Sequence, residues 1–429
     1  MKNNVLPRFM RLVHPAFIRL FFQTWRLFRH DPRCSARNLL RASRLATCDE
    51  KIIRHDGKLV YSSFLPPIPS RAAGRVLEAI DDTTGKGPFD AMLAGTRNAP
   101  VSMYVALTER CPYRCAHCSA AGRSPAPDIP TREMIKILRE VQDMGTAIIG
   151  LTGGEPLLRG DLPELVAALD DRSVVFLFTS GRGLTRDMAR TLKRAGLFAV
   201  GVSLDSADAA EMDALRGSPG AFEHAAAAIG HCRAAGLYTL AQTVADRGSM
   251  RSGKLLDIVK RAGELGAHEV RILENMPSGR YANITPDRIL TVEERAELRR
   301  FHIEANRLRG LPKVSVFAHT EDAERFGCGA GTQHSYIDAA GNLYPCDFVP
   351  LAFGNVREQP VAVLWKAMHR AIGKPRRECM VMELYAKKLL SEISMFPVAP
   401  PDARVLVARL DPVETLPGFY RCLTGKYCP

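Results

Sequence analysis

The stretch VSMYVALTERCPYRCAHC, residues 101–118, joins a short apolar run to three cysteines within eight positions. An apolar run of this length predicts a buried strand. Cys111, Cys115 and Cys118 follow it in a C-x3-C-x2-C spacing. Three thiolates on one short loop can ligate three irons of a four-iron cluster and leave the fourth iron open. Zinc with His117 as a fourth ligand, a disulfide and plain buried thiols are the alternatives.

Further apolar runs follow at intervals that fit βα units. They lie at residues 147–152, 173–179, 198–204, 237–244 and 269–273, with helical periodicity between them. Strands that alternate with helices predict a parallel sheet. Six such units fall short of a closed eight-stranded barrel, so we predict an α/β fold built on a partial (β/α)6 TIM-like barrel. Its site is expected at the C-terminal ends of the strands.

A second motif lies at the end of the second predicted strand. The segment is GLTGGEPLLRGDL, residues 150–162. Gly153 and Gly154 allow the backbone to approach a ligand closely, and Glu155 offers a carboxylate to an ammonium group. A GGE sequence alone is weak evidence for a binding site. One βα unit after C-x3-C-x2-C, it is strong evidence.

Across residues 101–275 the chain resembles the radical S-adenosylmethionine (radical SAM) superfamily, through CPYRCAHC, TGGEP, FTSG and VSLDS. The resemblance implies that the three cysteines bind a [4Fe–4S] cluster whose open iron chelates S-adenosylmethionine (SAM). It also implies reductive cleavage of SAM to a 5′-deoxyadenosyl radical, which takes hydrogen from an unactivated C–H bond. The alternative function is an iron–sulfur protein that transfers electrons or senses redox state, which leaves TGGEP unexplained.

The resemblance also implies which residues bind SAM. By position they are His117, Gly153, Gly154, Glu155, Ser180, Ser203, Asp205 and Arg216. The glycines and Glu155 would meet the methionine end, and His117 would lie against the adenine. Ser203 and Asp205 match the region that meets the ribose. Arg216 would face the methionine carboxylate. No catalytic residue beyond the clusters is predicted.

A second set of cysteines follows the barrel. It comprises Cys328, Cys346, Cys379, Cys422 and Cys428. The run from Cys328 to Trp365 resembles the start of a SPASM or twitch domain, which binds auxiliary [4Fe–4S] clusters in many radical SAM enzymes. The chain lacks the dense C-x2-C-x5-C run of a two-cluster domain. We therefore predict one auxiliary cluster, held by the first three cysteines and by either Cys422 or Cys428. Scattered structural thiols are the alternative.

The sequence pattern divides the chain into four regions. We expect a basic amphipathic arm at 1–48, a hairpin and helix connector at 49–100, the radical SAM barrel at 101–310 and the auxiliary-cluster domain at 311–429. The connector contains IIRHDGKLVYSSF, in which Asp56-Gly57 predicts the turn of a β-hairpin.

The N-terminal arm holds much of the formal net charge of +13. Its segment PAFIRLFFQTWRLFRHDP, residues 15–32, predicts a helix with arginines on one side and aromatic residues on the other. This composition is typical of a helix that lies in a membrane interface. A helix packed on the protein's own core is the other interpretation. So continuous an apolar face argues against nucleic-acid binding.

Composition narrows the class of protein. Hydrophobic residues make up 46% and charged residues 24%, as in ordinary globular proteins. No long uncharged apolar run occurs, and arginines interrupt the N-terminal one, which argues against a spanning helix and a secretory signal. The odd number of cysteines, 11, argues for a reducing compartment. We expect a cytoplasmic enzyme, peripheral to the inner face of the membrane if the arm binds lipid.

Partners follow from the implied chemistry. We expect a low-potential electron donor of the flavodoxin or ferredoxin type. The substrate is predicted to be large or membrane-associated, either a lipid or a peptide. The basic arm and the absence of a recognisable winged-helix peptide module favour the lipid, and a sugar is a further option. An anionic membrane surface is the corresponding partner of the arm.

Overall fold

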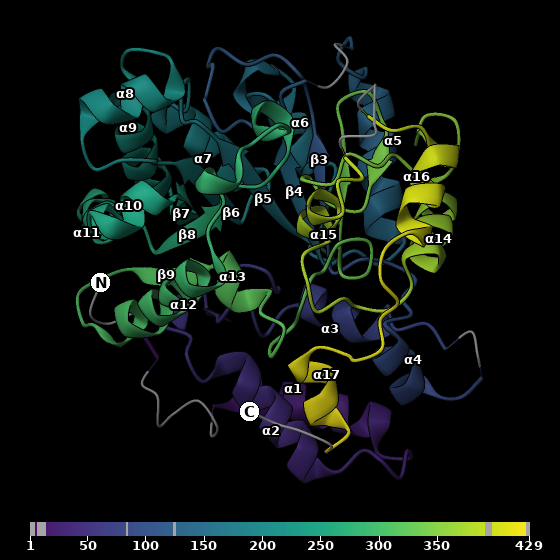
Figure 1. Cartoon of the computed structure of the whole chain (residues 1–429). Helices are drawn as coiled ribbons and strands as arrows, with labels where there is room; N and C mark the ends of the chain where they lie inside the picture. Colours follow the sequence, from purple (N-terminus) through teal and green to yellow (C-terminus); the bar gives the residue numbers. More distant parts are fainter. Residues whose placement is uncertain (1–4, 7–13, 83–84, 123–125, 391–396, 426–429) are drawn as a thin grey trace.

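A mostly parallel nine-stranded sheet forms the centre of the computed structural model, which describes residues 5–6, 14–82, 85–122, 126–390 and 397–425 (Figure 1). Its strand order is β11-β10-β3-β4-β5-β6-β7-β8-β9. The six predicted strands are confirmed as β3 (Ser102–Ala106), β4 (Ile148–Thr152), β5 (Val174–Thr179), β6 (Ala199–Ser203), β7 (Tyr238–Ala245) and β8 (Glu269–Glu274). Each pairs with the next in parallel, as a partial barrel requires.

Helices cover the outer face of this sheet. They are α5 (Thr131–Asp143), α6 (Leu162–Ala167), α7 (Arg186–Arg194), α8 (Ala209–Arg216), α9 (Ala221–Ala234), α10 (Arg247–Arg251), α11 (Lys254–Leu265) and α12 (Val292–Arg307). Helix α5 shows why they dock there. Its residues Met134, Ile137, Leu138 and Val141 are buried at helical spacing and join the core beneath the strands.

Three short strands extend the sheet beyond the predicted barrel. They are β9 (Lys313–Val316), β10 (His334–Ile337) and β11 (Leu343–Tyr344). Strand β9 pairs in parallel with β8, and β10 pairs in parallel with β3 on the other edge. The expected boundary between residues 310 and 311 therefore does not separate two sheets. The remaining C-terminal helices are α13 (Phe317–Thr320), α14 (Val361–Ile372), α15 (Met380–Ala386), α16 (Pro400–Ala408) and α17 (Gly418–Leu423).

Two inward positions of the barrel are glycines, which leave room for larger side chains from neighbouring strands. A Cβ on Gly150 would lie 2.4 Å from the Tyr104 ring, and one on Gly201 would lie 2.5 Å from Oε1 of Gln242. The rings of Tyr104 and Phe178 occupy this space, with centroids 4.8 Å apart. A cavity of about 1250 Å³ continues from them to the Cys111–Cys118 loop and to the N-terminal helices.

The predicted hairpin is confirmed as β1 (Ile53–His55) and β2 (Lys58–Val60). Its turn residues Asp56 and Gly57 have φ values of 46° and 71°, the left-handed conformation that such a turn requires. Ile53 and Val60 pack in one cluster with the first residues of β4 to β7. The hairpin therefore covers the N-terminal end of the barrel.

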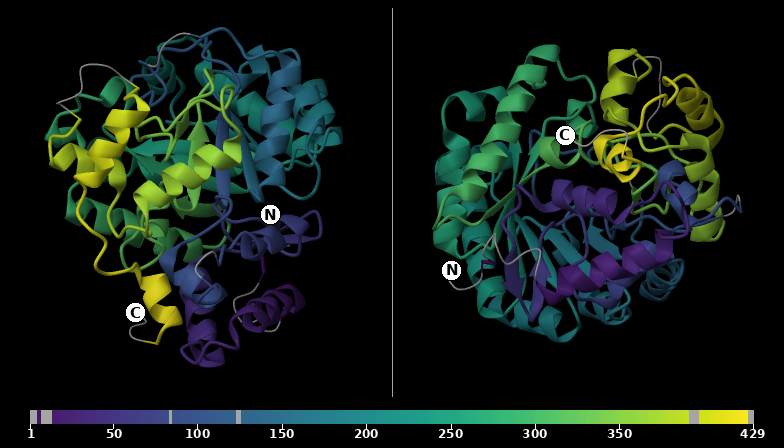
Figure 2. Two further views of the ribbon diagram at one scale, coloured as in Figure 1. Left: turned by 90° about the vertical axis from the view of Figure 1, so that its right-hand side faces the viewer. Right: turned by 90° about the horizontal axis from the view of Figure 1, so that it is seen from below.

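The N-terminal arm forms helices α1 (Pro15–Phe28) and α2 (Ala36–Thr47), which lie below the sheet with α3 (Arg71–Glu78), α4 (Pro88–Ala94) and α17 (Figures 1 and 2). The predicted helix is confirmed. Its side chains Phe21, Trp25 and Phe28 pack in one cluster with α2, α4 and α17. Most of its apolar face thus contacts the protein's own core. On α1 only Ile18 and Phe22 remain exposed as large apolar residues. No helix in the described part of the chain is long and apolar enough to span a bilayer.

A buried ion pair joins the connector to β9. Lys313 is fully buried, and its ammonium contacts the carboxylate of Glu50, to which Nε2 of His302 comes within 3.4 Å. Burial opposes ionisation of Glu50, but Lys313 and His302 outweigh it and lower its pKa. We expect Lys313→Met to reduce the free energy of unfolding by about 3–5 kcal/mol, because it leaves an uncompensated buried carboxylate. Urea unfolding measures this change.

The matched control for this prediction is Lys260→Met on the exposed face of α11, which should stay within about 0.5 kcal/mol of wild type. Equal stability of Lys313→Met and Lys260→Met would contradict a structural role for the buried pair.

Candidate active site

Backbone hydrogen bonds join the cysteine loop to the GGE loop. The Gly154 N–H donates to Thr108 O at 2.7 Å, and the Glu155 N–H donates to Arg110 O at 2.8 Å. The contact is tight because both glycines lack a side chain. A Cβ on Gly153 would lie 2.5 Å from Thr108 O, and one on Gly154 would lie 2.3 Å from Arg110 O. The structure therefore brings together the two motifs that the sequence singles out.

The three loop cysteines line the cavity at the C-terminal end of β3. Cys111 is exposed, Cys115 buried and Cys118 half-buried. Partial desolvation of the thiol, followed by the nearby thiols and Glu155, raises the pKa of Cys111 to about 11 even though the residue is exposed. The far side of the loop is held by the segment after β8, where Nη1 of Arg280 donates to Cys115 O at 2.7 Å. Three free thiols on a braced loop are the donors that an iron–sulfur cluster requires.

Glu155 is 1% exposed and accepts several hydrogen bonds. The Thr179 hydroxyl donates to it at 2.6 Å, and Ser180 donates through its backbone N–H at 2.8 Å and through its hydroxyl. Ser180, expected to contact the cofactor, therefore has its hydroxyl directed at Glu155. Ser180 thus orients the Glu155 carboxylate in this structure. One carboxylate oxygen accepts from Thr179 at the end of β5, and the other accepts from Ser180.

Asp205 and Arg216 form a buried ion pair beside the cysteine loop. Oδ2 of Asp205 lies 2.5 Å from Nη2 of Arg216 and 3.5 Å from Nε2 of His117. Nη1 of Arg216 lies 3.4 Å from Sγ of Cys115. Burial opposes the charge of Arg216, but Asp205 and Cys115 outweigh it and raise its pKa. Burial lowers the pKa of His117, which Asp205 opposes. With Ser203 at the end of β6, these residues line the cavity beside the cysteines.

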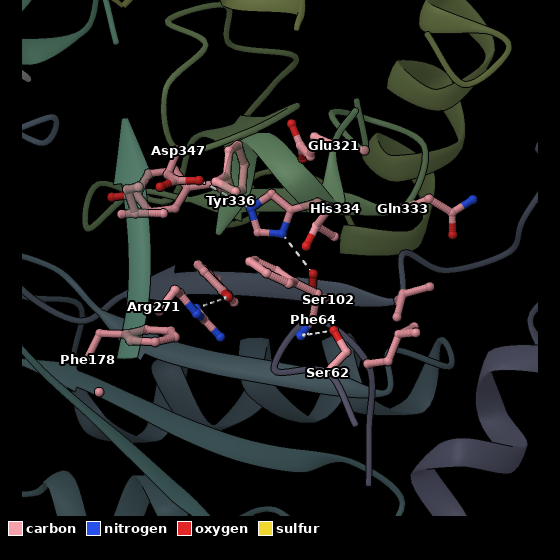
Figure 3. A pocket seen from close by; sticks show the side chains of 18 of the residues that line it. Ser62, Phe64, Ser102, Phe178, Arg271, Glu321, Gln333, His334, Tyr336 and Asp347 are labelled. Carbon is pink, nitrogen blue, oxygen red and sulfur yellow. Dashed lines mark hydrogen bonds and ion pairs between the residues drawn. The ribbon is translucent and has the colours of Figure 1, made fainter. Parts of the chain in front are cut away.

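The later cysteines form two adjacent groups. Sγ of Cys328, Sγ of Cys379 and a carboxylate oxygen of Glu321 lie within 4.8 Å of one another. Cys346 forms the second such group, with His334 and Asp347. Glu321, His334 and Asp347 line the cavity, on the wall drawn above Arg271 in Figure 3.

For the predicted fourth auxiliary ligand, either Cys422 or Cys428, the structure argues against Cys422 and leaves Cys428 untested. Cys422 is buried in α17, where it packs with Phe28 and Leu39 of the N-terminal helices. The structure does not bring it to Cys328 and Cys379, because α17 docks on α2 instead. Cys428 lies outside the described residues. Glu321 is the acidic residue that stands beside the two thiols, and no spacing rule in the sequence points to it.

Comparison with known proteins decides the family. The model of the radical SAM superfamily matches residues 105–249, and that of the iron–sulfur cluster-binding SPASM domain matches residues 328–380. The AdoMet-dependent heme synthase of Methanosarcina barkeri is 32% identical over 299 residues, covering 64% of this chain and 84% of that protein. The chain belongs to the radical SAM superfamily. The PqqA peptide cyclase of Streptomyces rochei is 31% identical over 303 residues, covering 66% and 81% of the two chains.

This radical SAM protein also resembles solved structures. Streptococcus suis SuiB bound to its precursor peptide SuiA matches with a TM-score of 0.53 and 18% identity over 63% of this chain and 65% of SuiB. That likeness supports the partial-barrel fold. Radical SAM and SPASM domains imply a [4Fe–4S] cluster, SAM and auxiliary iron–sulfur binding, so the protein is an enzyme. The alternative function, an iron–sulfur protein that only transfers electrons or senses redox state, is not supported by these relatives, which are named synthase and cyclase.

The residues fit these cofactors. Three thiols share one loop beside the cavity, and the loop glycines leave no room for a side chain. Both carboxylate oxygens of Asp205 are buried and accept no hydrogen bond in the described part of the chain, although its charge is paired with Arg216. Hydroxyl groups of a bound nucleoside would satisfy them.

Proposed function

We propose that this enzyme removes hydrogen from an unactivated C–H bond of an amphiphilic, lipid-type substrate that enters the cavity between α1 and α2. The proposed ligands of the SAM-binding cluster are Cys111, Cys115 and Cys118. Cys328, Cys346 and Cys379, with Glu321 in the fourth position, are the proposed ligands of one auxiliary cluster. Bound and reduced by a low-potential donor, the cluster and SAM supply a 5′-deoxyadenosyl radical.

The chain's own residues would orient SAM and keep water out. Glu155, held by Thr179 and Ser180, faces the cysteine loop and is proposed to accept hydrogen bonds from the methionine ammonium. Asp205 is proposed to accept from the ribose hydroxyls, and Arg216 to hold the methionine carboxylate. The enclosing aromatic walls would protect a reactive species from solvent and from stray hydrogen donors.

The lipid-type substrate is supported chiefly by the far end of the cavity. Its wall includes Ile18 and Phe22 of α1 and Leu40 of α2, which are 39%, 60% and 39% exposed. Exposed apolar residues that also line a cavity form an apolar mouth. Such a mouth suits an alkyl chain, which gains about 0.8 kcal/mol for each methylene group buried.

Positive charge surrounds this mouth. Besides Arg33, which pairs with Asp31 and Asp90, the exposed arginines on α1, α2 and the residues between them are Arg19, Arg26, Arg29, Arg37, Arg41 and Arg44. Each basic residue near an anionic bilayer contributes roughly 1 kcal/mol of binding energy. Reversible adsorption through these arginines would place the mouth against the lipid surface. The arm would then deliver substrate while its inner face stays packed on the protein.

Vesicle stimulation tests this proposal. The reconstituted enzyme, SAM and dithionite are incubated without oxygen with phosphatidylglycerol vesicles, with phosphatidylcholine vesicles or with peptides. We expect phosphatidylglycerol to raise 5′-deoxyadenosine release at least tenfold and to co-sediment with the enzyme. Replacing the six arginines by glutamine should abolish co-sedimentation, because the electrostatic attraction is lost. Release that responds to peptides and not to vesicles would contradict the lipid assignment.

A peptide is the second candidate substrate. It is favoured by the names of relatives such as the PqqA peptide cyclase, and of the Mycobacterium tuberculosis mycofactocin maturase MftC, which is 29% identical over 262 residues. The cavity is large enough for several side chains. The peptide arm of the vesicle experiment tests this candidate directly.

A further inference from the structure

Two buried arginines that line the cavity, Arg97 and Arg271, form no ion pair with a described residue. Arg271 extends from β8 into the barrel and is 2% exposed. Nη2 donates to Ser63 O at 2.9 Å, Nε to the Ser63 hydroxyl at 3.3 Å and Nη1 to the Tyr104 hydroxyl at 3.1 Å. All three acceptors are neutral, and Arg271 makes no ion pair with any residue that the structure describes.

Three acidic groups of the cavity are already paired with other cations. Asp205 pairs with Arg216, and Glu274 pairs with Arg295 at 2.9 Å. Asp347 pairs with His334 at 3.3 Å, on the wall above Arg271 in Figure 3. An uncompensated buried charge is costly unless a partner neutralises it. The place for that partner is the cavity itself.

The guanidinium is also held in a fixed orientation. Its Cζ lies 4.7 Å from the ring centroid of Phe64 and 5.3 Å from that of Phe178, so it stacks against two aromatic rings. A guanidinium has five N–H groups, and three are used by Ser63 and Tyr104. One N–H on each terminal nitrogen stays available. Two such donors match the two oxygens of an oxyanion.

We propose that Arg271 binds the anionic group, a carboxylate or phosphate, of the substrate. This proposal rests on the proposed function and makes it more specific. The anionic end of the amphiphilic substrate would lie inside the barrel, and its alkyl chain would extend toward the mouth between α1 and α2. Aromatic rings line part of the path between the barrel interior and the mouth. Phe64 follows Tyr61 in one segment, and the Tyr61 ring lies 5.8 Å from that of Phe17 on α1.

The position of Arg271 also limits where hydrogen is removed. Arg271 pairs in register with Gln242, which pairs with Ser203 at the proposed SAM site. Two strand spacings amount to about 10 Å. The carbon that loses hydrogen is therefore expected closer to the anionic end of the substrate than to the chain end at the mouth.

Equilibrium dialysis of the anaerobic holoenzyme tests the proposal without turnover. The probes are dodecanoate, dodecyl phosphate and the neutral dodecanamide, which share one chain. We expect the better of the two anions to bind at least tenfold more tightly than the amide. In Arg271→Gln this preference should vanish while the amide still binds, which shows that the cavity is intact. Arg271→Lys should keep part of the preference, because lysine keeps the positive charge but lacks the planar guanidinium with its paired N–H donors.

Arg261→Gln on the exposed face of α11 removes the same charge outside the cavity and should keep the full preference. Equal binding of anions and amide to wild type, or a preference that survives Arg271→Gln, would overturn the proposal. So would a loss of SAM affinity in Arg271→Gln as large as the loss of anion affinity, since the guanidinium would then serve SAM. If vesicles fail to stimulate the enzyme but the preference depends on Arg271, the anion site stands and only the lipid source is wrong.

Discussion

The triple variant Cys111→Ala, Cys115→Ala, Cys118→Ala is expected to release no 5′-deoxyadenosine. Its iron content should fall from about eight to about four per chain, because one of two four-iron clusters loses all its protein ligands. Anaerobic iron and sulfide determination, with chromatography of the nucleoside product, measures both effects.

The matched control removes the other set of thiols. The variant Cys328→Ala, Cys346→Ala, Cys379→Ala should also retain about four irons, yet it should still cleave SAM in the presence of dithionite. Identical behaviour of the two triple variants would contradict separate roles for the two sets. Four irons in the wild type would remove the auxiliary cluster from the account and leave the first cluster unaffected.

Gly154→Ala is expected to lower SAM cleavage by at least about 100-fold, since displacing a reacting centre by about 1 Å can have an effect of that size. The new Cβ would lie 2.3 Å from Arg110 O and 2.7 Å from Glu109 O, both backbone atoms of the cysteine loop. Either the loop or the GGE segment must move. The movement would break the hydrogen bonds that join Thr108 and Arg110 to the GGE segment.

Gly160→Ala in the same segment is the control. A Cβ at this position meets no atom within 4 Å, so activity should stay within about twofold of wild type. Dialysis with labelled SAM separates loss of binding from loss of cleavage. Wild-type SAM affinity and activity in Gly154→Ala would show that the contact between the two loops is not required.

The motifs and the barrel strands were predictable because their signals are local. Each strand is a short apolar run, and the cysteines and GGE follow strand ends, where parallel strands place their side chains together. The hairpin was predictable for the same reason, since Asp56-Gly57 specifies its turn. Strand β9 and the pairing of β10 with β3 were missed. Each strand has only four residues, and their pairing with β8 and β3 depends on contacts distant in sequence.

The inner surface of the cavity could not be predicted. Arg271 lies inside an apolar strand pattern, where a single arginine looks like an exposed residue. Its burial depends on Ser63, Tyr104 and two aromatic rings from separate parts of the chain. For helix α1 the sequence pattern is clear, but it does not identify the partner. Its amphipathic pattern fits both a membrane and a protein partner, and only tertiary packing against α2, α4 and α17 distinguishes them.

Transfer of deuterium tests the central claim most directly. The holoenzyme is incubated with SAM, dithionite and vesicles of fully deuterated anionic lipid in ordinary water, and the 5′-deoxyadenosine is analysed by mass spectrometry. We expect product that has gained one deuterium, because the abstracted hydrogen comes from a lipid C–H position. Product that stays unlabelled with lipid, but gains deuterium from a deuterated peptide, would contradict it.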